Sequence, residues 1–310
     1  MTARRRSAPE RAGASGFLLV DKPAGWTSHD VVDAARRWLG TRRVGHLGTL
    51  DPLATGVLPL AVRAATKLAP YLMDDRKAYV GSIELGVETD TLDADGVVMR
   101  VHPGALPAEP ELERALAAFA GEIEQVPPMY SAVKRAGVPL HRLAREGKSV
   151  ERAPKRVRID RIELIAYRPP LVELSVECSA GTYVRTLADD LGRALGCGAH
   201  LRNLRRTRSG PFGLAAARTP EQLADAAESG KLDALLIPAA DALGLEVVRV
   251  ASEQALRVRH GGEISATAAS PVGRPVLALG TDAELVAVME VLPGRRLRPL
   301  RVLHAVAPAD

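Results

Sequence analysis

The sequence predicts an α+β fold joined to a small, β-rich C-terminal unit. Apolar residues repeat with helical spacing in several segments, and the clearest of these stripes consists of Val31, Val32, Ala35 and Leu39. Val172 to Cys178 instead alternates apolar and polar residues, as a half-buried strand does. From Val247 to Val302, short apolar segments follow one another between Gly and Pro turns. This last pattern is typical of a small β-barrel of about 60 residues.

The N-terminal elements follow from caps and apolar periodicity. Phe17 to Val20 is expected to form a short buried strand, and a helix capped by Thr27 or Ser28 should end at Gly40. A strand over 57–62, a short helix over 65–73 and a strand over 77–85 should follow. On the last of these strands Tyr79 shares a face with apolar residues, so it should point inward or into a cleft.

The remaining elements of the larger unit are a helix, a strand-to-helix junction and a basic strand. Pro110 should open a helix, because proline is favoured at the first helical position. The strand that ends near Cys178 leads through Gly181 directly into a helix, which places Tyr183 and Arg185 where side chains can face a cleft. Residues 201–212 should then form a strand rich in arginine.

Composition excludes several classes of protein. With 46% hydrophobic residues, a mean hydropathy of −0.01 and no apolar run of roughly 18 residues, no segment is expected to span a membrane. Cys178 and Cys197 form no CxxC pair, which argues against a disulfide framework and against a cysteine zinc site. We therefore expect a cytoplasmic protein. Residues 1–15 are rich in arginine and lack an apolar core, so a disordered basic tail is expected there.

The distribution of charge points to a polyanionic partner. The net charge is only +5, but residues 134–168 hold eleven basic and four acidic residues, and residues 191–220 hold six arginines and no acid. Such runs also occur on ordinary solvated surfaces, and that alternative stays open. Aromatic residues make up only 3% of the chain, which disfavours a stacking platform for long single strands. A folded RNA held through its phosphates fits better.

The segment from Gly45 to Gly56 contains the first candidate for chemistry. Its glycines allow sharp turns, and Pro52 keeps Asp51 out of helical geometry. A lone carboxylate held in this way is a candidate catalyst. It is equally a candidate for capping the next turn, and these residues alone do not decide between the two roles.

The same segment, with the one before it, closely resembles the signature of the TruB family of tRNA pseudouridine synthases. Leu47 is one departure, since the family usually has a small residue there. Six blocks occur in the family's order: 16–30 with 45–56, Lys77-Ala78-Tyr79, 85–96, Gln125-Val126-Pro127-Pro128, 181–186 and Leu204-Arg205-Arg206-Thr207.

The resemblance implies an architecture. It implies a catalytic domain over 16–243, with a central mixed, largely antiparallel sheet flanked by helices, and a PUA-like RNA-binding domain over 244–310. A basic arm at about 130–156 would close over the RNA, with Lys134 among the residues that contact it. Arginines of the C-terminal unit would suit RNA phosphates.

The resemblance also implies a reaction and a set of site residues. The family converts uridine 55 of the tRNA T-loop to pseudouridine on a flipped-out base, with no cofactor and no metal. Asp51 would be the essential carboxylate, Arg185 its partner, and Tyr79 would stack on the base and handle the C5 proton. The residues expected to bind the substrate are His46, Tyr183, Leu204 and Lys134. We expect a monomer that binds the T-arm of tRNA without a guide RNA.

Three alternatives stay open at this stage. A tRNA-folding chaperone could use the same cleft without turnover, and a related synthase could depend on guide RNA and partner proteins. A glycosidase would need a second carboxylate at a defined separation, and the sequence shows no convincing acidic companion to Asp51. A calcium loop at Asp90, Asp93 and Asp95 is disfavoured, because the ligand positions would include Thr91 and His102; a turn is expected instead.

Overall fold

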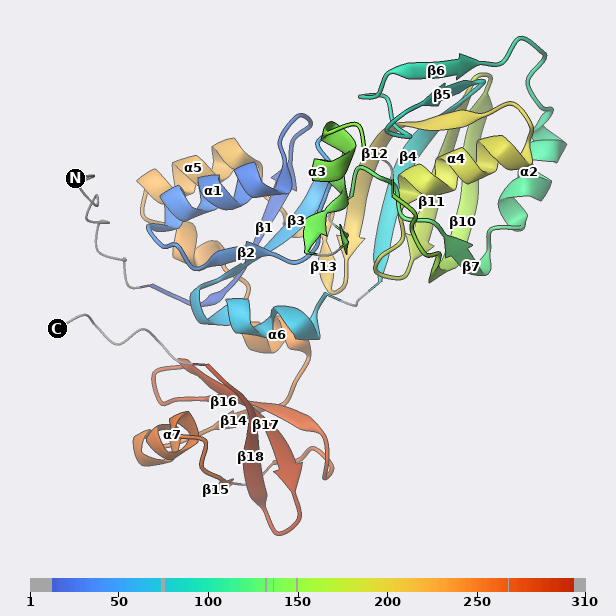
Figure 1. The fold of residues 1–310 in the computed structure, drawn as a ribbon. Helices are drawn as coiled ribbons and strands as arrows, with labels where there is room; N and C mark the ends of the chain where they lie inside the picture. Colours follow the sequence, from blue (N-terminus) through green and yellow to red (C-terminus); the bar gives the residue numbers. More distant parts are fainter. Residues whose placement is uncertain are drawn as a thin grey trace.

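The computed structural model describes residues 13–73, 76–131, 133–135, 137–148, 150–266 and 268–303. Nearly all of the expected N-terminal tail, 1–12, therefore lies outside the described residues. The described chain forms a large mixed sheet with helices beside it and a smaller C-terminal sheet (Figure 1). This confirms the predicted α+β class.

The large sheet has nine strands, and its spatial order is β1-β3-β12-β4-β11-β10-β7, with β2 and β13 paired at its side. All neighbours are antiparallel except β3 and β12, which run parallel. The strands are β1 (Gly16–Lys22), β2 (Val44–His46), β3 (Thr55–Val62), β4 (Lys77–Leu85), β7 (Gly121–Gln125), β10 (Lys155–Arg168), β11 (Leu171–Cys178), β12 (Ala199–Ser209) and β13 (Phe212–Gly213).

Strands β1 and β3 are buried on both faces, which explains their nearly continuous apolar sequences. Leu18 and Val20 pack into one core cluster, whereas Phe17 and Leu19 point to the other side and join a second cluster. Alternate residues of one strand therefore hold two layers together. Over Val172 to Cys178, strand β11 has the predicted alternation, with its apolar residues buried and its glutamates more exposed.

The helices begin and end at recognisable caps. Helix α1 (Ser28–Leu39) starts at a capping box made by Thr27 and Asp30 and ends at Gly40 in the left-handed conformation. Figure 1 shows α1 beside α5 (Pro220–Glu228), and α4 (Val184–Ala194) beside α2 (Glu109–Ala117) at the other half of the sheet. The start of α4 at a strand-to-helix junction agrees with the sequence pattern.

The helix predicted over 65–73 is instead a 3₁₀ helix, η1 (Arg63–Tyr71). Pro70 lies inside it and cannot donate a backbone hydrogen bond, so a regular α-helical pattern is not completed there. Two further 3₁₀ segments are η2 (Leu214–Ala216) and η3 (Leu232–Leu235).

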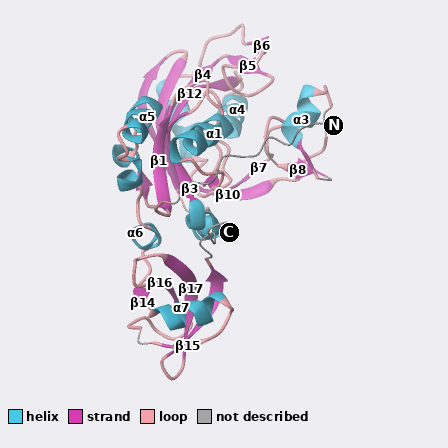
Figure 2. Ribbon diagram, turned by 90° about the vertical axis from the view of Figure 1, so that its left-hand side faces the viewer, coloured by secondary structure: helices cyan, strands magenta, loops and turns pink. Residues whose placement is uncertain are grey.

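The basic arm contains β8 (Lys134–Arg135), β9 (Val138–Pro139) and α3 (Leu140–Arg145). Figure 2 shows α3 and β8 standing away from the large sheet, while Leu140 is buried. Lys155 and Arg156, at the end of the range of about 130–156 expected for the arm, pair with β7. A separate hairpin, β5 (Val87–Thr89) with β6 (Val98–Val101), flanks the turn over 89–96.

The C-terminal part forms a five-stranded sheet in the order β14-β16-β17-β18-β15. Its elements are β14 (Val247–Arg249), α7 (Ser252–Arg259), β15 (Ile264–Ser265), β16 (Pro275–Leu279), β17 (Leu285–Leu292) and β18 (Arg296–Val302). The predicted strands are present, but helix α7 was not expected from the sequence. Helix α6 (Ala239–Leu243) precedes this part (Figure 1), and Leu277 and Leu303 pack into the same core cluster as Ala239.

The parallel contact between β3 and β12 depends on a glycine. Gly56 has φ +100°, and an added Cβ would lie 2.3 Å from the carbonyl oxygen of Arg206. Since that oxygen belongs to the backbone of a central strand, it cannot move aside without disturbing the sheet. Gly56 therefore sets how closely the two strands approach directly after the Asp51 segment.

We expect Gly56→Ala to lower the free energy of unfolding by about 2–4 kcal/mol, because it combines an unfavourable φ with a backbone clash. Gly45→Ala is the matched control, since no atom lies within 4 Å of the added Cβ. The control should change stability by no more than about 0.5 kcal/mol. Urea unfolding of both variants measures the difference, and equal stabilities would contradict this assignment.

Candidate active site

The Asp51 segment is anchored by burial on both sides of the carboxylate. Leu50 is buried, its N–H donates to the Ser28 hydroxyl at 2.8 Å, and that hydroxyl donates to the Leu50 carbonyl at 2.9 Å. After Asp51, Ala54 is buried and its N–H donates to the Asp51 carbonyl at 3.1 Å. The backbone is thus fixed from both ends, and the Asp51 side chain is left facing a cavity.

Lys22, at the end of β1, also anchors the Asp51 segment. Its ammonium group is fully buried and donates to three carbonyl oxygens, those of Pro23 at 2.8 Å, Trp26 at 2.6 Å and Pro52 at 3.2 Å. Burial lowers the pKa of Lys22 from 10.5 to about 8, although the nearby Asp51 carboxylate acts in the opposite direction. One buried cation therefore ties the first strand to the residue that follows Asp51.

Arg185 forms an ion pair with Asp51. Its Nε lies 2.8 Å from Oδ2 of Asp51, and its side chain is only 5% exposed, against 38% for Asp51. The two terminal nitrogens donate to backbone carbonyls, Nη1 to Thr91 at 3.0 Å and Nη2 to Tyr130 at 2.8 Å. The guanidinium is therefore fixed in the wall of the cleft while the carboxylate stays accessible.

A second carboxylate shares this guanidinium. Oδ2 of Asp93 lies 3.4 Å from Nη1 of Arg185, and Oδ1 accepts hydrogen bonds from the Thr91 hydroxyl at 2.6 Å and the Asp95 N–H at 3.2 Å. The expectation that Asp51 has no acidic companion was therefore wrong. Asp93 is buried and faces Arg185, because the turn over 89–96 folds back toward the start of α4.

The environment of Asp51 balances opposing effects. The walls of the cleft desolvate the carboxylate and raise its pKa above the usual 3.8, whereas the Arg185 guanidinium lowers it again. The Asp93 carboxylate raises the pKa of Asp51 further. Removal of Arg185 would leave two neighbouring carboxylates without their shared cation.

Tyr79 lies on β4 between Val176 of β11 and Arg206 of β12. It is 9% exposed and contributes to the cavity that also contains Asp51. Burial raises the pKa of Tyr79, and the Arg206 guanidinium, which is within hydrogen-bonding reach of its hydroxyl, opposes this shift. The sequence-based expectation that Tyr79 points into a cleft agrees with this position.

Tyr183 is positioned through its backbone by a buried glutamine. The Tyr183 N–H donates to Oε1 of Gln125 at 2.9 Å, and Nε2 of Gln125 donates to the Tyr183 carbonyl at 3.2 Å. Burial raises the pKa of the Tyr183 hydroxyl, and the neighbouring side chain of Ser131, at the base of the arm, opposes this shift.

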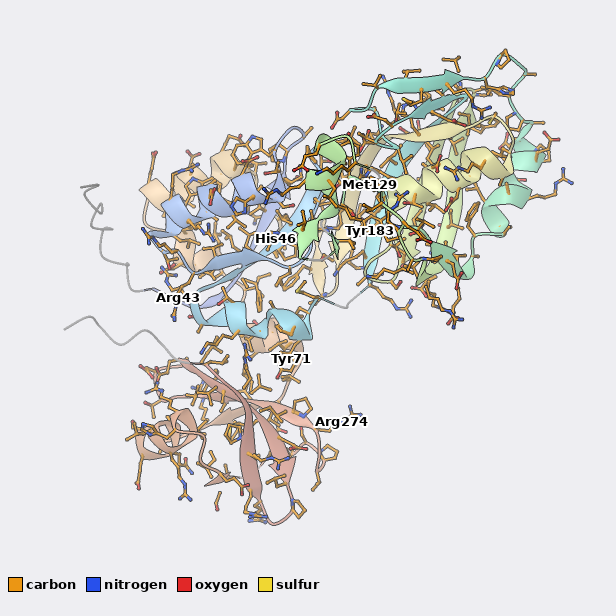
Figure 3. All side chains as sticks on the ribbon, viewed as in Figure 1. Arg43, His46, Tyr71, Met129, Tyr183 and Arg274 are labelled. Carbon is orange, nitrogen blue, oxygen red and sulfur yellow. The ribbon has the colours of Figure 1, made fainter. Side chains whose placement is uncertain are left out.

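These side chains surround a cavity of about 310 Å³, to which Leu204 of β12 also contributes. An adjoining cavity of about 500 Å³ shares Asp51 and Arg185 and extends to His46. Figure 3 shows His46 on the β2 side and Tyr183 on the α4 side, with α3 of the arm between them in this view. The structure thus brings Asp51, Tyr79, Tyr183, Arg185 and Leu204 to one cavity, with His46 beside it.

His46 lines the adjoining cavity and not the main one. Burial lowers the pKa of His46, and the charge of Arg206 lowers it further, so the imidazole is neutral at physiological pH. Lys134 lies in β8 of the arm, but its side chain is outside the described part of the structure.

Sequence reasoning missed four residues that support the site: Lys22, Asp93, Gln125 and Arg206. Each lies inside one of the six sequence blocks that resemble the TruB family, so position within a block could have indicated these residues. Their roles depend on hydrogen bonds to backbone groups of distant segments, and no residue spacing reports such contacts.

Comparison with known proteins identifies the family. Residues 36–184 match the model of the TruB family pseudouridylate synthase (N terminal domain), and residues 185–244 match that of the tRNA pseudouridylate synthase B C-terminal domain. The tRNA pseudouridine synthase B of Geobacter sulfurreducens is 45% identical over 305 residues, covering 93% of this chain and 99% of the relative. This chain belongs to the TruB family.

Other TruB family members agree. The tRNA pseudouridine synthase B of Stutzerimonas stutzeri is 44% identical over 301 residues, covering 95% of this chain and 97% of the relative. The chain is therefore a TruB-family tRNA pseudouridine synthase, an isomerase that modifies tRNA.

Solved structures show the same fold. A chain from the "Crystal Structure of a Cbf5-Nop10-Gar1 Complex" superposes with a TM-score of 0.68 and 29% identity, covering 93% of this chain and 85% of that chain. A chain from the "Structure of H/ACA RNP bound to a substrate RNA containing 2'-deoxyuridine" gives 0.67 and 26%, covering 95% and 87%.

The described residues contain neither a membrane-spanning helix nor a cluster of metal-binding side chains. No helix there combines the length and the apolar composition that crossing a membrane requires. Within the same residues, no three His, Cys, Asp or Glu side chains form a group able to hold a metal ion. Asp90 and Asp93, once considered for calcium, instead accept hydrogen bonds from neighbouring backbone N–H groups in the 89–96 turn.

The buried ammonium of Lys22 predicts a pH-dependent stability. Between about pH 8 and 10.5 the unfolded chain holds a proton on Lys22 that the folded chain has released. The unfolded state then binds more protons, so this contribution to stability rises with pH in that window. Relative to Lys22→Met, the unfolding free energy of the wild type should rise by up to about 1.4 kcal/mol per pH unit.

Urea unfolding at a series of pH values measures this difference. Lys231→Met removes an exposed lysine and controls for the loss of one positive charge. If the difference in unfolding free energy between wild type and Lys22→Met stays constant from pH 7 to 10.5, the buried Lys22 ammonium does not make the stability depend on pH.

Proposed function

We propose that this enzyme converts uridine 55 in the T-loop of tRNA to pseudouridine, with Asp51 as the essential carboxylate. The observation that carries the proposal is the accessible Asp51 carboxylate, which is paired with the buried Arg185 at 2.8 Å and opens on the cavity that Tyr79 lines. TruB family membership supports the tRNA substrate. We further propose that the enzyme acts as a monomer on the T-arm, without a guide RNA.

The reaction moves one glycosidic bond. The bond from ribose C1′ to N1 of uracil breaks, the base rotates, and a bond forms from C1′ to C5. The C5 proton leaves and N1 gains a proton, so no atom or electron is lost overall. The residues at the cavity therefore need to supply a carboxylate, a proton acceptor and walls that hold the free base.

Asp51 meets the first requirement when it is ionised. The Arg185 guanidinium opposes the desolvation that would otherwise favour the protonated form. Asp93 accepts hydrogen bonds on its other oxygen and holds the far side of the guanidinium, so Arg185 keeps its orientation toward Asp51. Protonation of Asp51 at low pH would then abolish the reaction.

The remaining residues hold the target base. Tyr79, Tyr183 and Leu204 line the cavity and supply the flat and apolar surfaces against which a pyrimidine stacks. A base inside a folded loop must first leave its stack, at a cost of a few kcal/mol. Neutral His46 lies beside the cavity, where it can fill the space the base vacates without burying a charge.

Affinity would come chiefly from phosphate contacts. The arm, whose strand β8 begins at Lys134, follows Tyr130 and Ser131 of the adjoining cavity, and a cluster of three cations lies nearer the C-terminal sheet. In this cluster, burial lowers the pKa of Lys67, and the charges of Arg301 and Arg43 lower it further. Nζ of Lys67 also donates to the Val302 carbonyl at 3.2 Å, so the cluster bridges η1 and β18.

Not every C-terminal arginine is equally suited to phosphates. Arg296 already pairs with Glu263 at 3.3 Å, and Arg298 pairs with Glu290 at 2.6 Å. Like charges around Lys67 instead repel one another, and a phosphate would relieve that repulsion. Figure 3 shows Arg43 on the side of the larger unit that faces the C-terminal sheet.

Asp51→Asn tests the catalytic assignment. The variant should fold and bind tRNA with an affinity within about threefold of the wild type, because the amide keeps the shape of the carboxylate. Turnover should fall below detection, a loss of more than about 10⁴-fold. Tritium release from C5-labelled tRNA measures turnover, and appreciable release would remove Asp51 from the proposed role.

Two assays separate this function from the alternatives. Nucleotide-resolution mapping of pseudouridine in tRNA incubated with the purified protein alone should find position 55. A bare T-arm stem-loop should also be modified, which a guide-dependent synthase could not do. Binding and refolding of tRNA without any pseudouridine would favour the chaperone instead.

The cation cluster makes a separate prediction about affinity. Lys67→Gln and Arg301→Gln should each weaken tRNA binding and reduce the slope of log K against log salt by about 1, because each removes a phosphate contact. Arg298→Gln is the matched control, since Glu290 already neutralises that side chain. Equal salt slopes for all variants would place the RNA elsewhere.

A further inference from the structure

Arg206 is an arginine of β12 that is 1% exposed, and no part of its charge reaches the surface. Its guanidinium donates to three backbone carbonyls: Nε to Val57 at 2.8 Å, Nη1 to Thr49 at 3.2 Å and Nη2 to Gly48 at 3.3 Å. These carbonyls lie just before and just after Asp51 in the sequence. A single side chain therefore fixes both ends of the catalytic segment.

The charge of Arg206 is not neutralised by an acidic side chain. Within the described residues, no carboxylate forms an ion pair with it, and its partners are the three carbonyls and the hydroxyl of Tyr79. Carbonyl dipoles satisfy the N–H groups but leave the full positive charge in place. This charge also lowers the pKa of His46 and of Lys22, after the larger effect of burial in each case.

Tyr79 lies directly opposite Arg206 in the pairing of β4 with β12. Since a guanidinium can only donate hydrogen bonds, the Tyr79 oxygen must be the acceptor in this contact. The other charged or titratable groups that act on the phenol are Cys178 of β11 and the Asp51 carboxylate. Both oppose ionisation of Tyr79, so Arg206 is the group that favours it.

We infer that Arg206 is a positioning residue, which fixes the Asp51 segment and the Tyr79 oxygen in one frame and stabilises negative charge on that oxygen. The inference rests on the proposed function and adds to it that Tyr79, which lines the cavity, is the group that receives the C5 proton. In that step the C5–H bond breaks, its electron pair returns to the uracil ring, and the proton ends on the Tyr79 phenolate. The phenol afterwards returns its proton to solvent, and N1 takes one up.

Arg206→Gln keeps hydrogen-bonding capacity and removes the charge, whereas Arg206→Lys keeps the charge and loses the fork of donors. In single-turnover tritium release, Arg206→Gln should be slower by about 10²-fold, with tRNA affinity within about threefold. The rising limb of its pH–rate profile should move to higher pH, and Arg206→Lys should restore part of the rate. In a Tyr79→Phe background, Arg206→Gln should have little further effect.

Arg63→Gln is the matched control, because Arg63 is also a buried arginine and donates to carbonyls, those of Ala14 and Leu39. Arg63→Gln should lower the free energy of unfolding and leave the pH–rate profile unchanged. If Arg206→Gln lowers the rate with no shift of the profile, and equally so in the Tyr79→Phe background, the residue is only structural and the inference is overturned.

A titration without RNA keeps the inference testable apart from turnover. Tyrosinate absorbance at alkaline pH, with the Tyr79→Phe signal subtracted, reports the ionisation of Tyr79 alone. In Arg206→Gln this ionisation should move to higher pH; if that variant does not fold, Arg206→Lys should show a smaller shift in the same direction. An unchanged titration would overturn the role of Arg206, whereas a turnover-competent Asp51→Asn would overturn the proposed function and leave the titration result standing.

Discussion

The guanidinium of Arg185 is the constraint on which the site depends. It is buried at the start of α4 and joins two carboxylates, Asp51 and Asp93, that belong to different loops. Its terminal nitrogens also hold carbonyls of Thr91 and Tyr130. A planar guanidinium donates hydrogen bonds only in fixed directions. The Asp51 segment, the 89–96 turn and the base of the arm must therefore all lie around this one side chain.

Two further buried cations lie beside the Asp51 segment, and both donate hydrogen bonds to carbonyl oxygens. Lys22 contacts three carbonyls below the segment, and Arg206 contacts three more on its other side. Carbonyl oxygens satisfy the N–H groups but do not cancel the charge of either cation. Burial raises the pKa of Asp51, and Lys22, together with the stronger effect of Arg185, lowers it.

The central strands place these groups. β12 contributes Leu204 and Arg206, β4 contributes Tyr79, and β3 follows the Asp51 segment, so the cavity lies where β3, β12 and β4 are neighbours. The parallel contact between β3 and β12 is permitted by Gly56, which lets the two backbones approach closely. On the other side of β12, a shift of one residue in its pairing with β4 would turn Tyr79 and Arg206 to opposite faces of the sheet.

The sequence alone determined the α+β class, most strands and helices, and the family, because apolar periodicity, caps and ordered motifs are local patterns. It also supplied Asp51, Tyr79 and Arg185 as candidates. Only the tertiary structure decided which groups surround the cavity: Asp93 as a second acid near Arg185, Ser131 near Tyr183, and Arg206 opposite Tyr79 in the pairing of β4 with β12. These contacts join segments far apart in the chain through backbone carbonyls and N–H groups, which every residue possesses and which therefore leave no mark in the sequence.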